Sequence, residues 1–478
     1  MPETPETAST WAWLARQQEK IRKVLRTVLG IDRAIAFTIF ARGWASLAGL
    51  VTMALIARFL SPAEQGYYYT FSSLVALQLI FELGFSFVIL QLAAHERAQL
   101  RFAADGLIEG NPVAHSRLAS VLQTSVKWYS GAALLMVATL LLAGLRFFRI
   151  HAGTGVAWKL PWCLLAVMVA LTFQLDPVFS FLEGCGFIWQ VASMRFGQAF
   201  VGSLLAWAAI STHHGLYAPA MVVVGQATVG ICFLGVPQRS RILKGLLRFP
   251  VREHFVGWRR EIWPFQWKIA ASSLSGYFIF QLFNPVLFAY QGPVAAGRMG
   301  MSLSISSAIG AIAMSWMNTK ASPFGNLIAR GEIAVLDKLF FRTLWQSTSL
   351  AATGALSFFL FLLWAGHNYP KLASRTLTPW AFAMLLLAMV INQLIFAEAL
   401  YLRAHKREPF LVISVAGAFL QGCATWALGK YWNANAVATS TFVLTALFGL
   451  PTGTYIFITK RRQWHTPAVS PGRAREYN

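Results

Sequence analysis

The sequence predicts an all-α integral membrane protein, with about twelve transmembrane helices in two six-helix lobes around a central cavity. Of its 478 residues, 56% are hydrophobic and only 12% are charged, roughly half the charged fraction of a soluble protein. The apolar residues form runs of about 20 or more, the length that crosses a bilayer. Several runs contain an isolated charge, which is costly in hydrocarbon and normally faces a protein interior or a wet cavity.

The apolar runs and the segments between them give the expected organisation. An N-terminal segment, 1–33, precedes a first lobe at 34–236. A basic connector, 237–263, leads to a second lobe at 264–459 and a basic tail at 460–478. The spans are expected at 34–59, 66–93, 119–147, 158–182, 187–210, 216–236, 264–288, 294–317, 338–364, 377–403, 408–430 and 433–459.

The distribution of Lys and Arg predicts the orientation. Basic residues crowd the N-terminal segment, the connector and the tail, whereas the loops 60–65 and 211–215 contain none. Basic loops stay in the cytoplasm, so both termini are expected there, in a bacterial inner membrane. Residues 11–29 have apolar residues at helical spacing beside a basic face, which predicts an amphipathic helix on the cytoplasmic leaflet; a partly ordered tail is the alternative.

The net charge of +22 raises the question of a nucleic-acid partner. The basic residues cluster between apolar runs, a pattern that indicates anionic membrane lipids as partners and no nucleic acid. The four cysteines have no metal-ligand spacing, and no Walker loop is present, so neither a metal nor a cofactor is expected.

Five charged residues inside apolar runs of the first half are the candidate site. Arg42, Lys127 and Arg195 each lie about eight residues from a cytoplasmic end, hence about 12 Å deep. Glu82 and Asp176 are expected at a similar level, as supporting charges in one cavity. Asp176 precedes Pro177, which should bend or break its helix.

Two interpretations of these charges stay open. The three cations could bind an anionic headgroup, because the planar arginine fork donates two parallel hydrogen bonds to a phosphate. Alternatively, Arg42 could pair with Glu82, and Arg195 with Asp176, as internal ion pairs. The second half offers fewer candidates: Lys268, Arg298 and Glu398 are possible contributors, and snorkelling is the simpler explanation for the two cations.

Two short matches indicate an internal repeat: 62–66 with 293–297, and 181–183 (FLE), at the end of the fourth span, with 401–403 (YLR), at the end of the tenth. The segment 62–66 (PAEQG) opens the second span, and 293–297 (PVAAG) opens the eighth, 231 residues later. Related halves of this kind usually place the substrate site between them. The three tyrosines at 67–69 are expected in an outer aromatic belt.

The segment 57–70 (ARFLSPAEQGYYYT), followed by Leu77-Gln78 and Glu82-Leu83-Gly84, resembles the first two helices of bacterial polysaccharide and O-antigen flippases. These belong to the multidrug/oligosaccharidyl-lipid/polysaccharide exporter superfamily, and Arg42 fits their charged first helix. The similarity covers about residues 35–95. It implies movement of a lipid-linked oligosaccharide or polysaccharide precursor, for O-antigen and lipopolysaccharide synthesis, from the inner to the outer leaflet.

Three alternative functions predict sequence features that differ from those of this chain. An ion-coupled exporter of drug-like cations, in the same superfamily, predicts an anionic site. A membrane transferase or polymerase predicts a large external loop, whereas the outer loops here are short, so the chain is not expected to be an enzyme. A scaffold without transport would leave the intramembrane charges as an unexplained cost. The coupling ion, if any, is not indicated.

The orientation predicts a labelling pattern. In a background without the four native cysteines, Gly245→Cys in the connector should resist an impermeant thiol reagent added to intact cells, and His213→Cys should react. Both should react after the membrane is opened. Labelling of position 245 but not 213 from outside would reverse the orientation.

Overall fold

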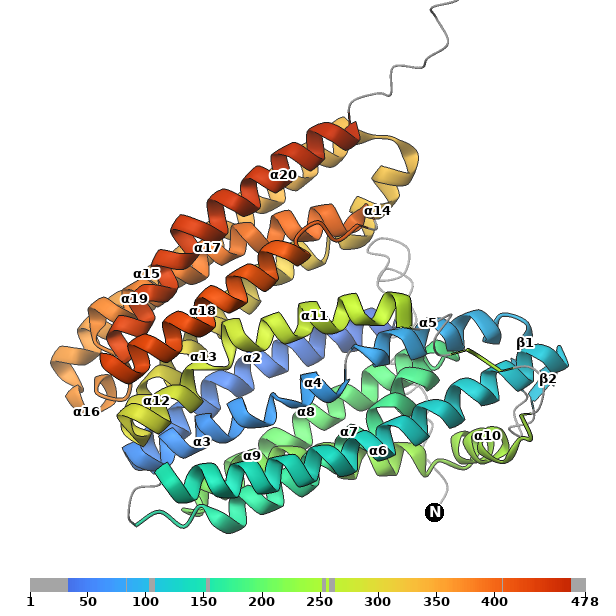
Figure 1. Ribbon diagram of the computed structural model, residues 1–478, viewed down its shortest axis with the longest axis horizontal. Helices are drawn as coiled ribbons and strands as arrows, with labels where there is room; N and C mark the ends of the chain where they lie inside the picture. Colours follow the sequence, from blue (N-terminus) through green and yellow to red (C-terminus); the bar gives the residue numbers. More distant parts are fainter. Residues whose placement is uncertain are drawn as a thin grey trace, which may run out of the picture.

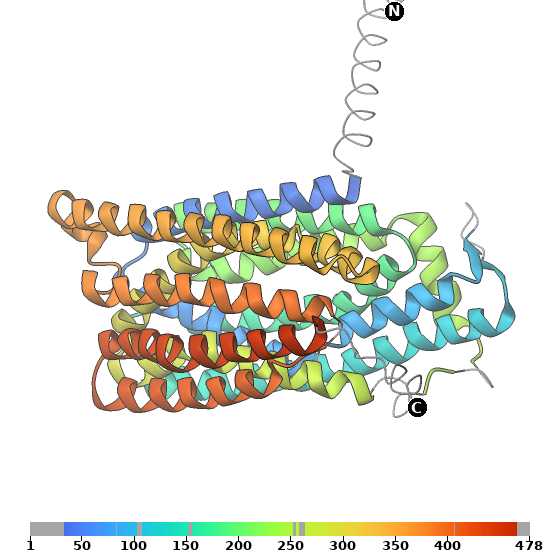
Figure 2. The same ribbon diagram turned by 90° about the horizontal axis from the view of Figure 1, so that it is seen from above.

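Long helices that run nearly side by side dominate the fold (Figures 1 and 2). The computed structural model describes residues 33–82, 84–102, 108–151, 155–251, 255–257, 263–405 and 407–465. The expected amphipathic helix at 11–29 and most of the basic tail lie outside these residues.

The first half of the chain forms one group of helices, in the lower part of Figure 1. Its members are α2 (Arg33–Phe59), α3 (Pro62–Val75), α4 (Gln78–Glu82), α5 (Phe85–Arg97), α6 (Pro112–His151), α7 (Lys159–Gly184), α8 (Ile188–Ser211), the 3₁₀ turn η1 (Gly215–Tyr217) and α9 (Ala218–Leu234).

The second half begins after α10 (Pro237–Arg248), which runs across the long helices rather than alongside them (Figures 1 and 2). Its helices are α11 (Trp263–Phe280), α12 (Phe283–Gln291), α13 (Pro293–Asn318), α14 (Ala321–Arg330), α15 (Ile333–Asn368), α16 (Pro370–Ala373), α17 (Pro379–Ala404), α18 (Leu411–Tyr431), α19 (Ala434–Leu444), the π-helical turn η3 (Thr445–Gly449) and α20 (Leu450–His465).

Membrane spans account for most of these helices. Within the described residues, eight stretches are long and apolar enough to cross a bilayer, or nine if the bent pair 62–82 and 85–97 forms one span. Every expected range coincides with a helix or a run of helices, but the count of twelve spans stays a prediction. The all-α prediction missed one hairpin, β1 (Leu100–Phe102) with antiparallel β2 (Ile108–Gly110).

Local sequence explains the break in the second expected span. Ser61 caps α3 through a capping box with Glu64, and Pro62 occupies the first turn. The axis then bends by 44° between α3–α4 and α5. Gly84, with φ of 68°, supplies the left-handed conformation that ends α4 beside Glu82. The expected break at Pro177 does not occur, because α7 continues from Lys159 to Gly184.

The two repeated segments pack directly against each other. A Cβ atom on Gly66 would lie 1.9 Å from the carbonyl oxygen of Pro293, and one on Gly297 would lie 2.9 Å from the amide nitrogen of Gly66. The backbones of α3 and α13 therefore meet at a distance that only glycine permits, as in other close helix pairs in membranes. We call this contact the glycine seam.

The expectation of an outer aromatic belt is wrong for two of the three tyrosines. Tyr67 is fully buried and its ring packs on Phe148 and Phe288, while Tyr69 donates a hydrogen bond to the sulfur of Met301 at 3.3 Å. Both rings occupy the joint between the halves, because the seam turns this face of α3 inward.

From the seam the two groups of helices diverge toward the other end of the molecule (Figure 1). The two halves thus touch at one end of the molecule and separate at the other, which the charge pattern predicts to be the cytoplasmic end. The end with the glycine seam is called the outer end on that prediction.

The seam makes a stability prediction. Gly66→Ala should lower the unfolding midpoint of the detergent-purified protein by several degrees, because overpacking a tight contact costs about 1–3 kcal/mol. Gly131→Ala on α6 is the matched control, since a Cβ there meets no atom within 4 Å. An equal midpoint for Gly66→Ala and wild type would contradict the described seam.

Candidate functional site

A polar cluster lies among the helices of the first half. Tyr129 of α6 is fully buried, and its hydroxyl is 3.1 Å from that of Ser86 at the start of α5. The charges of Glu82, at the end of α4, and Asp176, in the middle of α7, both act on this phenol. Thus the four helices α4, α5, α6 and α7 bring polar residues to one place, among them Glu82 and Asp176 from the five candidate charges.

Arg195 of α8 joins this cluster from the side. One of its guanidinium nitrogens lies 3.9 Å from a carboxylate oxygen of Glu183, and its side chain is 50% exposed. Asp176, the partner expected from sequence, also feels the charge of Arg195, but the described ion pair is with Glu183. A long, half-exposed ion pair leaves hydrogen-bond donors of Arg195 open to a further ligand.

Only the backbone of Arg42 is described; its side chain lies outside the described part. Helices α2 and α8 run in parallel, because Trp44 donates a hydrogen bond to Ser203 at 3.0 Å and Phe37 packs near Phe196. The same register places Arg42 beside residue 201, six residues and thus about 9 Å beyond Arg195 along the direction of α8. The two arginines therefore lie on neighbouring helices at different depths, and their joint action stays a prediction.

Lys127 does not join the cluster. It is exposed, and it lies two positions from Tyr129, which puts it about 200° away around α6. Because Tyr129 faces Ser86, Lys127 faces away from Glu82 and Asp176. The residues one turn away on the helix surface are Gln123, Thr124, Ser130 and Gly131, and Leu134, which is 71% exposed, lies two turns further along the same face.

The balance of charge consequently differs from the expected cationic excess. Among the described side chains, Glu82, Asp176 and Glu183 stand against Arg195. Any net positive charge at this place would depend on Arg42.

The two described candidates from the second half, Arg298 and Glu398, do not meet in one place. Arg298 donates a hydrogen bond to the carbonyl of Ser374 at 3.0 Å, near the outer end. Glu398 is buried and accepts a hydrogen bond from Thr454 at 2.9 Å, between α17 and α20. The side chain of Lys268 lies outside the described part.

Two adjoining cavities open among the helices of the second half. The larger has a volume of about 390 Å³ and the smaller about 220 Å³. They share Ile279, Phe280, Asn392, Phe396, Gln421 and Thr445. The sequence analysis did not identify this place, since Asn392, Gln421 and the π-helical turn come from separate helices.

Sequence reasoning missed an ion pair that joins α15 to α20 in this half. Asp337 of α15 accepts hydrogen bonds from Arg461 at 3.0 Å and from Tyr401 at 2.6 Å. The 124 residues between the charged partners hid the pairing. A clue existed, since Asp337 and Arg461 both stand beside long apolar runs.

A set of hydrogen bonds beside the glycine seam holds the outer ends together. Gln65 of α3 donates to the carbonyls of Gly297 and Arg375, at 2.8 and 3.0 Å. Arg375, in the loop before α17, donates to the carbonyl of Leu60 at 2.6 Å. We call Gln65, Arg375 and the Leu60 carbonyl the outer clasp, because they join the first half to the second.

Burial lowers the pKa of the Arg375 guanidinium, and the nearby Glu64 carboxylate opposes that shift. The half-buried guanidinium thus depends on the Leu60 carbonyl and the Gln65 side chain of the first half.

The described residues include no group of three or more His, Cys, Asp or Glu side chains that could hold a metal ion. The polar groups of the cluster are one half-exposed arginine (Arg195), three carboxylates (Glu82, Asp176 and Glu183) and a buried phenol (Tyr129).

Sequence comparison finds no relative: no protein-family model and no curated protein matches the chain. Solved structures, however, share its fold. An inward-facing multidrug resistance MATE family transporter of the MOP superfamily matches with a TM-score of 0.53 and 12% identity, covering 87% of this chain and 99% of that one.

Two further structures agree. A MOP superfamily transporter from Pyrococcus furiosus has a TM-score of 0.53 at 12% identity, over 91% of this chain and 96% of its own. The lipid II flippase MurJ, in an inward closed conformation, has a TM-score of 0.56 at 11% identity, over 89% and 87%. The chain therefore has the fold of MOP superfamily transporters, as the resemblance implied.

The outer clasp predicts a change in the separation of the halves. Arg375→Gln removes the guanidinium that binds the Leu60 carbonyl, so the outer ends should part more often. Spin labels at positions 212 and 431, measured by double electron–electron resonance, should show a new population at longer distance.

Arg298→Gln is the control, because its described hydrogen bond joins two residues of the second half. It should leave the distance distribution unchanged. If Arg375→Gln does the same, the clasp does not hold the halves.

Proposed function

We propose that the chain is a flippase that moves a lipid-linked oligosaccharide or polysaccharide precursor, such as an O-antigen unit, across a bacterial inner membrane by alternating access. One observation carries the proposal: the halves are sealed at their outer ends by the glycine seam and the outer clasp, and diverge at the other end (Figure 1). Such a shape admits a headgroup from the cytoplasmic side.

Arg195 is the first contact for the substrate in this proposal. It is half exposed, near the cytoplasmic end of α8, and its ion pair with Glu183 is long. A diphosphate would displace or share this weak pairing, since arginine matches phosphate with two parallel hydrogen bonds. Arg42, about 9 Å deeper on the neighbouring helix, would receive the headgroup next.

In this proposal the carboxylates of the cluster help the substrate to leave the site. Glu82, Asp176 and Glu183 reduce the positive potential around the arginines, and a transport site must bind weakly enough to let go. The lipid tail stays in the bilayer beside the gap between the halves, and rocking of the halves exposes the headgroup outward. Lys127 takes no part, because it faces away from the cluster.

The fold supports a transporter in general terms. Each of the three similar structures is named as a transporter or a flippase, none as an enzyme, and one of them as a lipid II flippase. The choice of a saccharide as cargo rests on the sequence resemblance of residues 35–95.

One observation favours a second candidate, an ion-coupled multidrug-type exporter. The described side chains of the cluster carry more negative than positive charge, which suits a cationic cargo. The arginines on α2 and α8 favour the flippase.

Transport assays in a strain that lacks the chromosomal gene distinguish the flippase from the exporter. Arg42→Ala/Arg195→Ala should reduce surface display of the saccharide at least tenfold, because each lost charged hydrogen bond costs about 1.5–3 kcal/mol. Arg→Lys at both positions should keep part of the activity, since the charge stays but the paired geometry is lost. Membrane abundance is measured for each variant by immunoblot.

Lys159→Ala/Lys430→Ala, which removes two exposed cations elsewhere, is the control and should transport normally. Full surface display of the saccharide by Arg42→Ala/Arg195→Ala at normal abundance would refute phosphate binding by the two arginines. Rescue of Arg42→Ala by Glu82→Ala would assign Arg42 to an ion pair instead. Loss of cationic-dye efflux in Asp176→Asn, with saccharide display unchanged, would support the exporter.

A further inference from the structure

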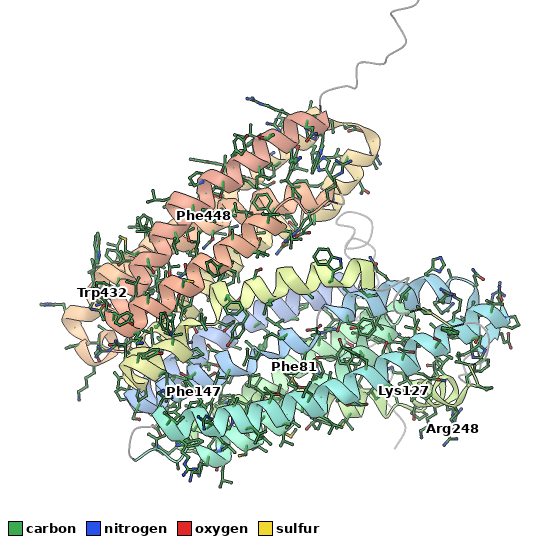
Figure 3. The ribbon with its side chains drawn as sticks, viewed as in Figure 1. Phe81, Lys127, Phe147, Arg248, Trp432 and Phe448 are labelled. Carbon is green, nitrogen blue, oxygen red and sulfur yellow. The ribbon has the colours of Figure 1, made fainter. Side chains whose placement is uncertain are left out.

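The two adjoining cavities of the second half are bounded on one side by α11, which also packs against α4 of the first half. The remaining walls come from α13, α17, α18, α19 and the π-helical turn η3. Figure 3 places Phe448, which lines the smaller cavity, midway along the second half, well away from Trp432 at the outer end. The cavities therefore lie near the middle of the long helices, the depth at which transporters built from repeats bind their substrates.

The walls of the cavities offer no charge to a ligand. Among the described residues that line them, none is acidic and only Arg403 is basic. Arg403 donates hydrogen bonds to Glu408 at 2.9 and 2.7 Å, so its charge is already paired. A phosphate or a cation would find no open counter-charge here, and the ligand that fits is uncharged.

Uncharged polar groups in the walls are open to a ligand. Within the described part of the chain, neither the Asn392 amide nor the Thr445 hydroxyl makes a hydrogen bond, and both residues line both cavities. The amide nitrogen of Gln421 donates to Thr441 at 3.3 Å and to Thr425 at 3.2 Å, which leaves its oxygen to accept. A half-buried amide without partners costs free energy unless water or a ligand supplies the hydrogen bonds.

Two aromatic rings lie beside these groups. Phe280 and Phe396 line both cavities with ring centroids 6.1 Å apart, and they are 44% and 42% exposed. The face of such a ring carries partial negative charge, so it attracts C–H groups that carry partial positive charge. The cavities thus combine an apolar stacking surface with hydrogen-bonding amides.

The helix that carries Thr445 is irregular at this point. The five residues Thr445–Gly449 form the π-helical turn η3, and Thr445, Phe448 and Gly449 line the smaller cavity. Turns of this type are rare and occur frequently at functional sites. The irregular turn and the open polar groups therefore mark the same place.

We propose that these two cavities bind an uncharged sugar ring of the cargo. The apolar C–H face of a pyranose would stack on Phe280 or Phe396, and its hydroxyls would pair with Asn392, Gln421 and Thr445. The larger cavity, about 390 Å³, falls within the range of about 300–1,000 Å³ that is typical of small-molecule sites. The proposal rests on the proposed function in one respect, the presence of a saccharide in the cargo.

The amides favour a sugar over a lipid chain. Hydrocarbon would fill the apolar part of the cavities but would leave Asn392 and Thr445 without hydrogen bonds. A sugar ring satisfies both the rings and the amides. The labour is then divided between the halves: Arg195 meets the diphosphate in the first half, and the neutral cavities of the second half meet the saccharide.

Saturation-transfer difference NMR on the full chain in nanodiscs tests the site. The probes are the methyl glycosides of glucose, galactose, rhamnose and N-acetylglucosamine. Ring protons of at least one glycoside should receive saturation from wild type. Asn392→Leu/Gln421→Met keeps the side-chain volume but removes the hydrogen bonds, so it should raise the Kd of that glycoside about tenfold.

A second variant tests the space rather than the hydrogen bonds. Ser307 is exposed and lines the larger cavity, so the ring of Ser307→Phe should occupy the cavity and abolish binding. Asn368→Leu/Gln463→Met, which removes two exposed amides outside the cavities, is the matched control and should bind as wild type. Circular dichroism verifies the helix content and the unfolding midpoint of each variant.

Cyclohexylmethanol, which has a six-membered ring and one hydroxyl, tests whether the hydroxyls are recognised. Binding as tight as that of the glycosides would assign the cavities to an apolar ligand and overturn the proposal. The same follows if no glycoside binds wild type, if both cavity variants bind as wild type, or if the control loses as much. Transport is not measured in this experiment, so a negative result overturns the sugar site and leaves the arginine test of the flippase unaffected.

Discussion

The close backbone contact between Gly66 and Gly297 is the constraint on which the rest of the structure depends. A Cβ on either residue would overlap the facing helix, so α3 and α13 can meet only because both positions lack a side chain. The contact joins corresponding segments of the two halves. It sets the outer ends together, buries Tyr67 and Tyr69 at the joint, and leaves the other ends of the helices apart.

The outer clasp adds directional hydrogen bonds to this backbone contact. Gln65 and Arg375 donate hydrogen bonds to backbone carbonyls across the joint. These acceptors belong to the backbone, so they cannot move away by a change of side-chain rotamer. Parting the halves at this joint requires the loss of several such bonds, and it returns the Arg375 guanidinium to water.

The polar cluster of the first half shows how the fold tolerates charge within apolar helices. Ser86, Tyr129 and Asp176 come from three helices, and the bend at Gly84 frees Glu82 at a helix end. Each group finds polar neighbours, which reduces the cost of its burial. Arg195 stands at the exposed margin of this cluster and can exchange its long ion pair with Glu183 for another anion.

Helix α10 carries its charge on the outside of the helix bundle. Its apolar residues Ile242, Leu243 and Leu246 are buried, and its cations Lys244 and Arg248 are exposed. The two hydrogen bonds of Gln123 fix the last turn of this basic helix against α6.

The sequence by itself determined the membrane class, the helical ranges and the repeated segments, because apolar length and Gly-Pro spacing are local properties. It also identified Glu82, Asp176 and Arg195 as charges within helices. Only the tertiary structure decided which face each charge occupies: Lys127 faces outward because Tyr129, two positions away, faces inward. It alone decided the partners as well, Glu183 for Arg195 and Arg461 for Asp337. Helical periodicity fixes which residues share a face but not what that face meets, and this depends on how distant helices pack.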